Sequence, residues 1–311
     1  MSQPAPRGPG KKFWPIAVRI GTTLAVAALV VVAVRTLDMG ALKQSLLSAS
    51  AAPLVLGCAL SFAMQVAKSA YWRTILAPMK AVPLRTMLWY TVAANGTSLV
   101  LPMRGGEALR VWWLKRNHGI PLTAVGAAVA FEKVFDAAAL VLVVSPLPWL
   151  LPDQAWLGRL RWALPIVLLV VVALVLLARR ARASVKWLSD LKLFDDLGPV
   201  VHSFGYVMVS WLSDVTLILV VMRSVGIPLH LEAALLVLLA VNLAIAIPAA
   251  PGNLGSLELG AAFALTTVHV PEAPAAAFAI LYHGVQIATL LLAWIAGTVL
   301  TALLSRGQRS A

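Results

Sequence analysis

Two arginines and a glutamate surround a pair of glycines in the stretch RGGEALR, which ends at Arg110. Arg104 precedes Gly105 and Gly106, where the lack of side chains lets a ligand approach the backbone. A helix that begins near Glu107 would point its free N–H groups at the same place, and the guanidinium groups would add positive charge. The stretch therefore predicts a site for phosphate. The alternative is an internal ion pair between Glu107 and an arginine that braces the segment.

A second charged cluster lies in the middle of the apolar run Leu122–Leu151. Glu132 and Asp136 are four residues apart, so they share one face of a helix, and Lys133 is adjacent. Ionisable groups in hydrocarbon cost several kcal/mol unless they are paired or hydrated. These three residues predict either a polar pocket with a possible proton relay, or a structural ion-pair cluster with the arginines of RGGEALR.

A third group of polar and glycine residues lies in the last third of the chain. The stretch PGNLGSLE contains Pro251, Gly252 and Gly255, which would form a turn, and ends on Glu258, the counterpart of Glu107. The next apolar segment carries a polar face made of Tyr282, His283 and Gln286. The alternatives are that PGNLGSLE forms a turn without a functional role, and that His283 is a hydrogen-bonded histidine of the core. No metal-ligand cluster and no nucleophile–base spacing appears, so neither a metal, a cofactor nor an enzyme active site is predicted.

The composition indicates what positions these clusters. The chain has 311 residues, of which 61% are hydrophobic and 12% charged, whereas a soluble domain is about 45–50% apolar and about 25% charged. This excludes a soluble enzyme and a disordered chain, and the one cysteine, Cys58, excludes a disulfide scaffold. The net charge of +13 is typical of nucleic-acid binding, but topology explains it better in a membrane protein, so no nucleic-acid partner is expected.

The apolar runs predict an all-α polytopic membrane protein with about six full transmembrane helices. At about 20 residues per crossing, the crossings are Ile16–Val34, Leu54–Ala70, Leu122–Leu151, Leu164–Ala178, Val201–Met222 and Ala275–Leu304. Two runs, Thr86–Leu101 and Ala233–Ile247, are short, and each breaks on a proline followed by glycines and a glutamate. Such breaks are tolerated at membrane depth only where protein or water surrounds them, which predicts two re-entrant helical hairpins.

The positive-inside rule supports the hairpins. If both hairpins return to the side they entered from, most of the 25 Lys and Arg residues lie on one side, whereas full crossings would split them nearly evenly. We therefore expect a multi-pass protein of a bacterial-type inner (plasma) membrane. Both termini, including a basic tail over residues 1–15, would be cytoplasmic.

The two hairpin regions also resemble each other. MKAVPLR (Met79–Arg85) matches MRSVGIPLH (Met222–His230), and Pro121 and Pro271 have the same spacing as Lys133 and His283. The same offset pairs Glu132 with Tyr282 and Asp136 with Gln286. We interpret the chain as a single membrane domain, 1–311, built from pseudo-repeats at about 53–151 and 201–304. Three crossings separate the start of the first repeat from the start of the second, so the second is inverted, which is typical of transporters with a site near the midplane. Chance likeness between Ala/Leu-rich segments is the alternative.

The motifs RGGEALR, FEKVFD and PGNLGSLE resemble, in the same order, signatures of the lysylphosphatidylglycerol synthase transmembrane (flippase-like) family. The likeness covers nearly the whole chain. It implies movement of a lipid or lipid-linked headgroup between leaflets. Lys133, Asn253 and His283 depart from the residues that are usual in this family. No segment could hold the soluble aminoacyltransferase domain, so we do not expect synthesis of lysyl-lipid.

Two functions follow from these observations. The first is a lipid flippase-like transporter: the RGGEALR residues would hold an anionic or lipid-linked headgroup, the second cluster would balance charge or take up protons, and the third group would complete the pocket. The second is a non-transporting membrane partner that holds or regulates a lipid-modifying or glycosyltransferase enzyme. An intramembrane enzyme has less support.

Overall fold

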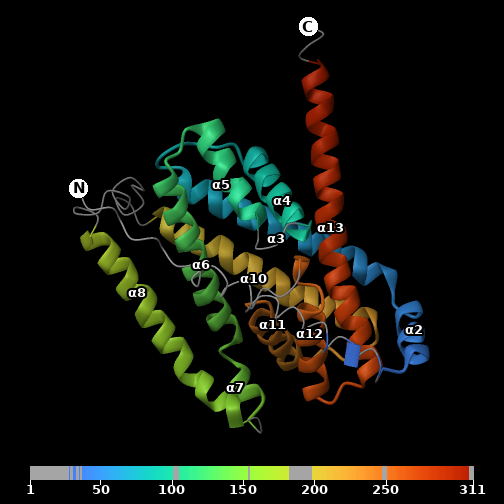
Figure 1. Cartoon of the computed structure of the whole chain (residues 1–311). Helices are drawn as coiled ribbons and strands as arrows, with labels where there is room; N and C mark the ends of the chain where they lie inside the picture. The colour runs from blue at the N-terminus through green and yellow to red at the C-terminus, as the bar shows by residue number, and fades with distance from the viewer. Residues whose placement is uncertain are drawn as a thin grey trace, which may run out of the picture.

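The computed structural model describes residues 37–100, 105–152, 155–181, 198–246 and 251–307, together with 28, 31–32 and 35. All regular elements in these residues are helices (Figure 1). The elements of the first half are α2 (Met39–Leu47), α3 (Ala51–Leu76), α4 (Leu84–Val100), α5 (Gly105–His118), α6 (Leu122–Val144) and α7 (Leu147–Leu150). Those of the second half are η2 (Ala155–Trp162), α8 (Ala163–Ala181), α10 (Gly198–Ser224), α11 (Leu231–Ala246), η3 (Pro251–Asn253), α12 (Ser256–Thr267) and α13 (Glu272–Gly307).

Three of the described helices, α3, α10 and α13, are long and apolar enough to cross a membrane. The expected all-helical, multi-pass architecture is therefore confirmed at this level. Helix α6 has 23 residues but carries the charged cluster in its middle. The basic tail 1–15 and nearly all of the expected first crossing, Ile16–Val34, lie outside the described residues.

The two short runs form two pairs of short helices. Helices α4 and α5 have 17 and 14 residues, and α11 and α12 have 16 and 12. At about 1.5 Å per residue they are roughly 18–26 Å long, which is less than the ~30 Å of a hydrocarbon core. The members of each pair pack side by side. We call α4–α5 the first hairpin and α11–α12 the second hairpin.

One predicted run is divided in the structure. The segment Leu122–Leu151 was expected as one crossing, but α6 ends at Val144 and a turn at Ser145 and Pro146 precedes the four-residue α7. Pro146 has no backbone N–H to continue the helical hydrogen bonds, and Pro148 follows it two residues later. The single-helix expectation is therefore wrong at its C-terminal end.

The molecule has two main hydrophobic cores among the described residues. One is built almost entirely from α3, α4, α5 and α6, with Tyr71, Trp72 and Phe135 at its centre. The other is built mainly from α10, α11, α12 and α13, with Phe278 and Tyr282 stacked at a ring-centroid distance of 5.6 Å. Helices α3 and α10 pack along each other and join the two cores. The first core therefore lies mainly in the first half of the chain and the second core mainly in the second half.

Candidate functional site

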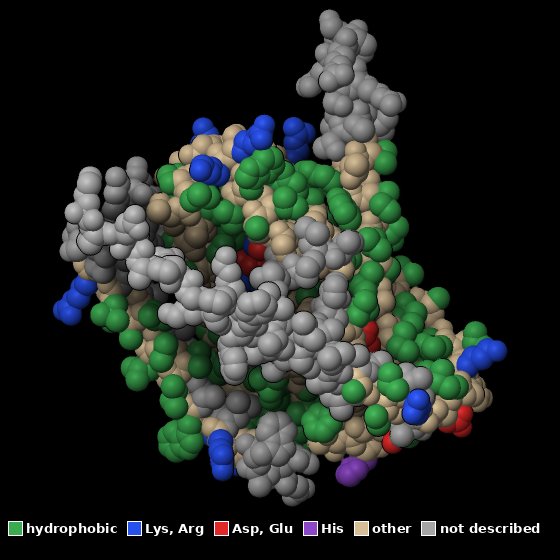
Figure 2. All heavy atoms as spheres, viewed as in Figure 1, with side chains coloured by type: hydrophobic (Ala, Val, Ile, Leu, Met, Phe, Trp, Pro, Cys, Tyr) green, Lys and Arg blue, Asp and Glu red, His purple; other side chains and the backbone are tan. Residues whose placement is uncertain are grey.

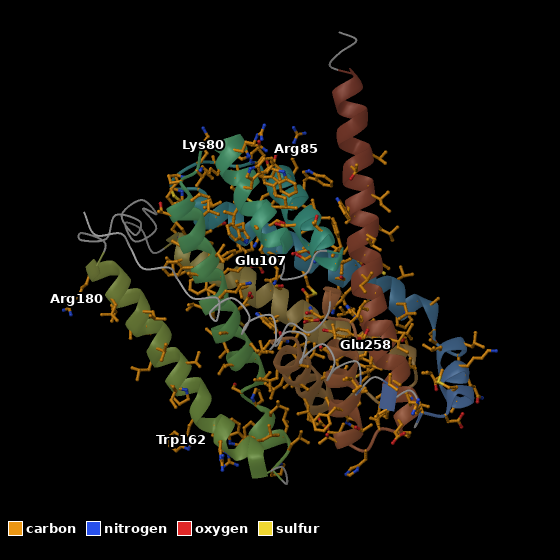
Figure 3. All side chains as sticks on the ribbon, viewed as in Figure 1. Lys80, Arg85, Glu107, Trp162, Arg180 and Glu258 are labelled. Carbon is orange, nitrogen blue, oxygen red and sulfur yellow. The ribbon has the colours of Figure 1, made fainter. Side chains whose placement is uncertain are left out.

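A cavity of about 820 Å³ with both polar and apolar side chains on its wall lies where the two halves meet. Helices α3 and α10, both hairpins, α6, η3 and α13 all contribute to its wall. Figure 2 shows an acidic side chain in a recess at the middle of one face, and Figure 3 places Glu107 in that region. The residues of the cavity wall that carry titratable or amide groups are Gln65, Lys68, Asn95, Glu107, Lys133, Asp136, Asp214, Asn242, Asn253, His283 and Gln286.

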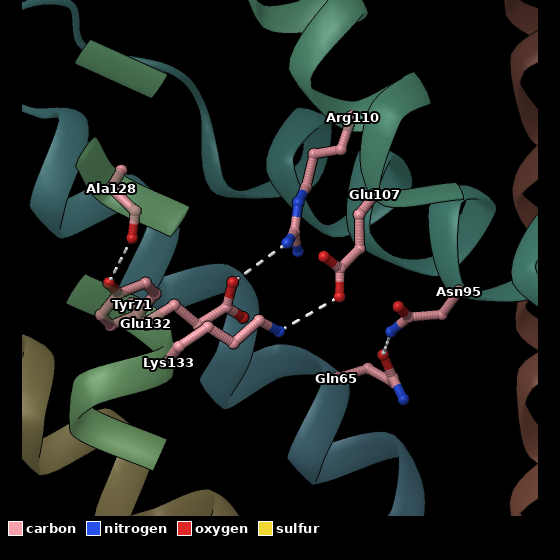
Figure 4. A network of polar contacts seen from close by, with 8 residues as sticks. All are labelled: Gln65, Tyr71, Asn95, Glu107, Arg110, Ala128, Glu132 and Lys133. Atoms are coloured by element: carbon pink, nitrogen blue, oxygen red, sulfur yellow. Dashed lines mark hydrogen bonds and ion pairs between the residues drawn. The ribbon is translucent and has the colours of Figure 1, made fainter. Parts of the chain in front are cut away.

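Two ion pairs join the first hairpin to α6 (Figure 4). Lys133 Nζ lies 3.1 Å from Glu107 Oε1, and both residues line the cavity. Arg110 Nη2 lies 3.1 Å from Glu132 Oε2, and both side chains are buried. The Arg110 guanidinium also stacks at 4.1 Å over the ring of Trp72, which has no exposed surface. The structure thus places Arg110 in an internal ion pair behind the cavity wall, with α6 rather than with Glu107.

The second hairpin makes the equivalent contact with α13. Glu258 Oε1 lies 2.7 Å from His283 Nδ1, and Glu258 Oε2 accepts a hydrogen bond of 2.8 Å from the Gly255 N–H. The latter bond caps the N-terminus of α12, and Gly255 has a φ of 83°, which glycine adopts readily. In both halves, therefore, a carboxylate on the second helix of a hairpin contacts a basic side chain on the following long helix.

The ends of the two hairpins approach each other at the cavity. A Cβ on Gly252 would lie 3.4 Å from Leu99 Cδ2, so η3 packs against the end of α4. Gly252 and Asn253 have φ values of 61° and 58°, and both line the cavity. Irregular backbone of this kind is expected at membrane depth only where it lines a cavity or is covered by protein.

The left-handed backbone at Asn253 gives a first prediction. Asparagine tolerates this conformation and β-branched residues do not. We expect Asn253→Val to lower the free energy of unfolding by about 1–2 kcal/mol, whereas Asn253→Gly leaves it unchanged or raises it slightly. Thermal unfolding in detergent, followed by circular dichroism, measures both. Equal effects of the two substitutions would contradict a left-handed Asn253.

The predicted site residues separate into three groups. Those on the cavity wall are Glu107, Lys133, Asp136, Gly252, Tyr282, His283 and Gln286. Those that are described but not on the wall are Gly105, Gly106, Arg110, Glu132, Gly255 and Glu258. Arg104 and the side chain of Pro251 lie outside the described residues, although Pro251 begins η3. The backbone of Gly106 faces Ala94 and Ser98 of α4, and its N–H donates to Ser98 Oγ at 3.2 Å.

Sequence reasoning missed part of the wall. Gln65 and Lys68 lie in an apolar helix, α3, and a lysine at membrane depth is itself a signal of a functional site. Lys68 lines the same cavity as Asp136 of α6. Asn95 and Asn242 also line the cavity, and Asn95 Nδ2 donates to Gln65 Oε1 at 2.8 Å. Asp214 of α10 is a further single acidic residue on the wall.

Within the described residues, no three His, Cys, Asp or Glu side chains are close enough together to hold a metal ion. The arrangement offers instead paired charges and amides that can exchange their internal contacts for contacts with a polar ligand. Membrane-length helices that surround a cavity with charged and amide groups on its wall define a multi-pass membrane protein.

The chain belongs to the family described as lysylphosphatidylglycerol synthase TM region, whose model matches residues 16–293. The resemblance carried by RGGEALR, FEKVFD and PGNLGSLE is thereby confirmed. A search of curated proteins and a search of solved structures returned no match. The family indicates a membrane function related to lipids.

Proposed function

We propose that this protein moves a lipid between membrane leaflets by taking its polar headgroup into the cavity. The observation that carries the proposal is the cavity itself, which is lined by charged and amide groups and lies among α3, α10 and α13. A lipid headgroup needs such a polar environment to leave the membrane surface, while its acyl chains remain among apolar side chains. Exposed apolar residues of α3, α10 and α13, such as Val55, Val209 and Ile295, offer that surface.

The Glu107–Lys133 pair is the best placed to contact a headgroup. Its two side chains keep 32% and 45% of their surface exposed, whereas Arg110 and Glu132 keep 4% and 6%. An exposed ion pair contributes little to stability, so its members can separate at small cost. Lys133 can then bind a phosphate or another anionic group of the lipid, in the role first assigned to Arg110, and Glu107 can accept hydrogen bonds from the same headgroup.

The proposal also includes the membrane topology of the chain. We place the protein in a bacterial-type inner membrane with six crossings, two re-entrant hairpins in an inverted repeat and cytoplasmic termini. In support, the first hairpin and α6 correspond to the second hairpin and α13 in packing and in their acid–base contacts. Lys80 and Arg85 lie at one end of the bundle and Trp162 at the other (Figure 3), as expected for a basic cytoplasmic side and an aromatic interface.

The test measures exchange of a fluorescent anionic phospholipid between leaflets of proteoliposomes. We expect Glu107→Gln and Lys133→Gln to slow exchange by about tenfold, the effect of losing roughly 1.4 kcal/mol of headgroup interaction. Lys115→Gln is the matched control, because Lys115 is exposed near the end of α5, and it should leave exchange unchanged.

Equal exchange in wild type and both cavity variants would contradict the proposed role of the Glu107–Lys133 pair. No exchange by purified wild-type protein, combined with variants that still function in cells, would favour the alternative of a partner or regulator of a lipid-modifying or glycosyltransferase enzyme.

A further inference from the structure

Asp214 is a buried carboxylate in the middle of α10, and only 8% of its surface is exposed. The hydroxyl of Tyr282 on α13 donates a hydrogen bond to Asp214 Oδ1 at 2.7 Å. Tyr282 is itself 1% exposed and is held by stacking on Phe278. Both Asp214 and Tyr282 line the cavity, so the carboxyl group lies at the boundary between a packed interior and a space large enough for water.

The titratable groups around Asp214 come from four other helices. Those that share its cavity wall are Lys68 of α3, Glu107 of α5, Lys133 and Asp136 of α6, and Tyr282 and His283 of α13, while α11 contributes the neutral Asn242. Lys133 pairs with Glu107, and His283 contacts Glu258. Lys68 is attracted by the carboxylates of Asp136, Glu132 and Asp214, but among the described residues none of them lies within ion-pair distance of it. Among the described residues no cation lies within ion-pair distance of Asp214.

A buried carboxylate without a cation of its own is costly, and binding a proton removes that cost. We propose that Asp214 is a proton-binding site on the cavity wall, held as a neutral carboxylic acid in the arrangement that the structure shows. Because Tyr282 donates to Oδ1, the proton resides on Oδ2. It comes from cavity water when the O–H bond forms and returns to water when that bond breaks, so no other reactant is needed.

The site also links the proton to the ligand cavity. A headgroup that displaced Lys68 on the cavity wall, or placed its own charge beside Asp214, would change how tightly Asp214 holds its proton. This link between headgroup binding and the proton rests on the proposed lipid movement. The protonation of Asp214 itself does not. If both hold, lipid exchange depends on pH through Asp214.

Infrared spectroscopy of the full-length protein in lipid nanodiscs at neutral pH, in which the spectrum of each variant is compared with that of wild type, tests the site directly. We expect wild type to show the C=O stretching band of a protonated carboxylic acid, and Asp214→Asn to lose it. Tyr282→Phe should keep the band but move it to higher frequency, because the hydrogen bond to Oδ1 is lost. Asp38→Asn is the matched control, since that exposed carboxylate caps α2 at the surface, and it should leave the band unchanged.

An Asp214→Asn spectrum identical to that of wild type in this region would overturn the proposal, as would a band that Tyr282→Phe does not move. The exchange assay separates the two proposals. Lipid exchange by wild type without the acid band would sustain the transport function and reject the proton site. The acid band without any lipid exchange would sustain the proton site and reject the transport function. With both present, Asp214→Asn should remove the pH dependence of exchange.

Discussion

Replacing Arg110 with methionine is expected to lower the free energy of unfolding by about 3–5 kcal/mol, because it leaves Glu132 buried and unpaired. The two groups lie 3.1 Å apart with almost no exposed surface, and the guanidinium loses its stacking on Trp72 as well. Methionine keeps much of the volume, so the effect measures the unpaired charge more than a cavity. Unfolding in mixed micelles with increasing SDS, followed by circular dichroism, gives the difference.

The double variant Arg110→Met with Glu132→Leu distinguishes this account from simple loss of packing. Replacing a whole buried ion pair by apolar residues of similar volume is often neutral or stabilising, so the double variant should recover most of the loss. Arg116→Met is the matched control, since Arg116 is on the same helix and stacks over Trp112 but is exposed; its cost should be below about 1 kcal/mol. A double variant less stable than Arg110→Met would show that the pair is not the cause.

The sequence was sufficient to predict the approximate positions of most long helices and of the charged clusters that they carry, but not α2 or the break between α6 and α7. The bounds of α4 and α11 differ by only one or two residues from the apolar runs Thr86–Leu101 and Ala233–Ile247, because prolines and glycines mark the ends. It could not predict which acid pairs with which base. Adjacent residues on a helix point about 100° apart, so Glu132 faces the buried Arg110 while Lys133 faces the cavity, and this depends on how α6 is rotated against α5.

The cavity wall was only partly predictable for a related reason. Residues such as Gln65, Lys68 and Asp214 are single polar groups in long apolar helices, without a motif around them. Their importance depends on the packing of α3 against α6 and of α10 against α13, which places Lys68 and Asp136 on one cavity wall and brings Asp214 close to Tyr282. These contacts join segments that are far apart in the chain, so local sequence patterns cannot reveal them.

The first hairpin provides the second large expected effect. A Cβ on Gly106 would overlap the Ala94 carbonyl and also meet Ser98 Oγ, so α4 and α5 approach each other only because residue 106 has no side chain. Small residues at such crossings allow close helix packing in membranes. The second hairpin is similar, since a Cβ on Gly260 would lie 2.9 Å from Ala244 Cβ and 3.0 Å from the Ala240 carbonyl oxygen.

We therefore expect Gly106→Ala to lower the free energy of unfolding by about 3 kcal/mol, at the upper end of the usual cost of overpacking. It should also reduce lipid exchange, because separating α5 from α4 moves Glu107 away from Lys133. Gly126→Ala is the matched control: it is a helical glycine on α6 whose added Cβ would meet nothing within 4 Å. That variant should gain up to about 1 kcal/mol from better helix propensity. The same chemical change thus has opposite signs at two positions, and equal effects would contradict the close packing of the first hairpin.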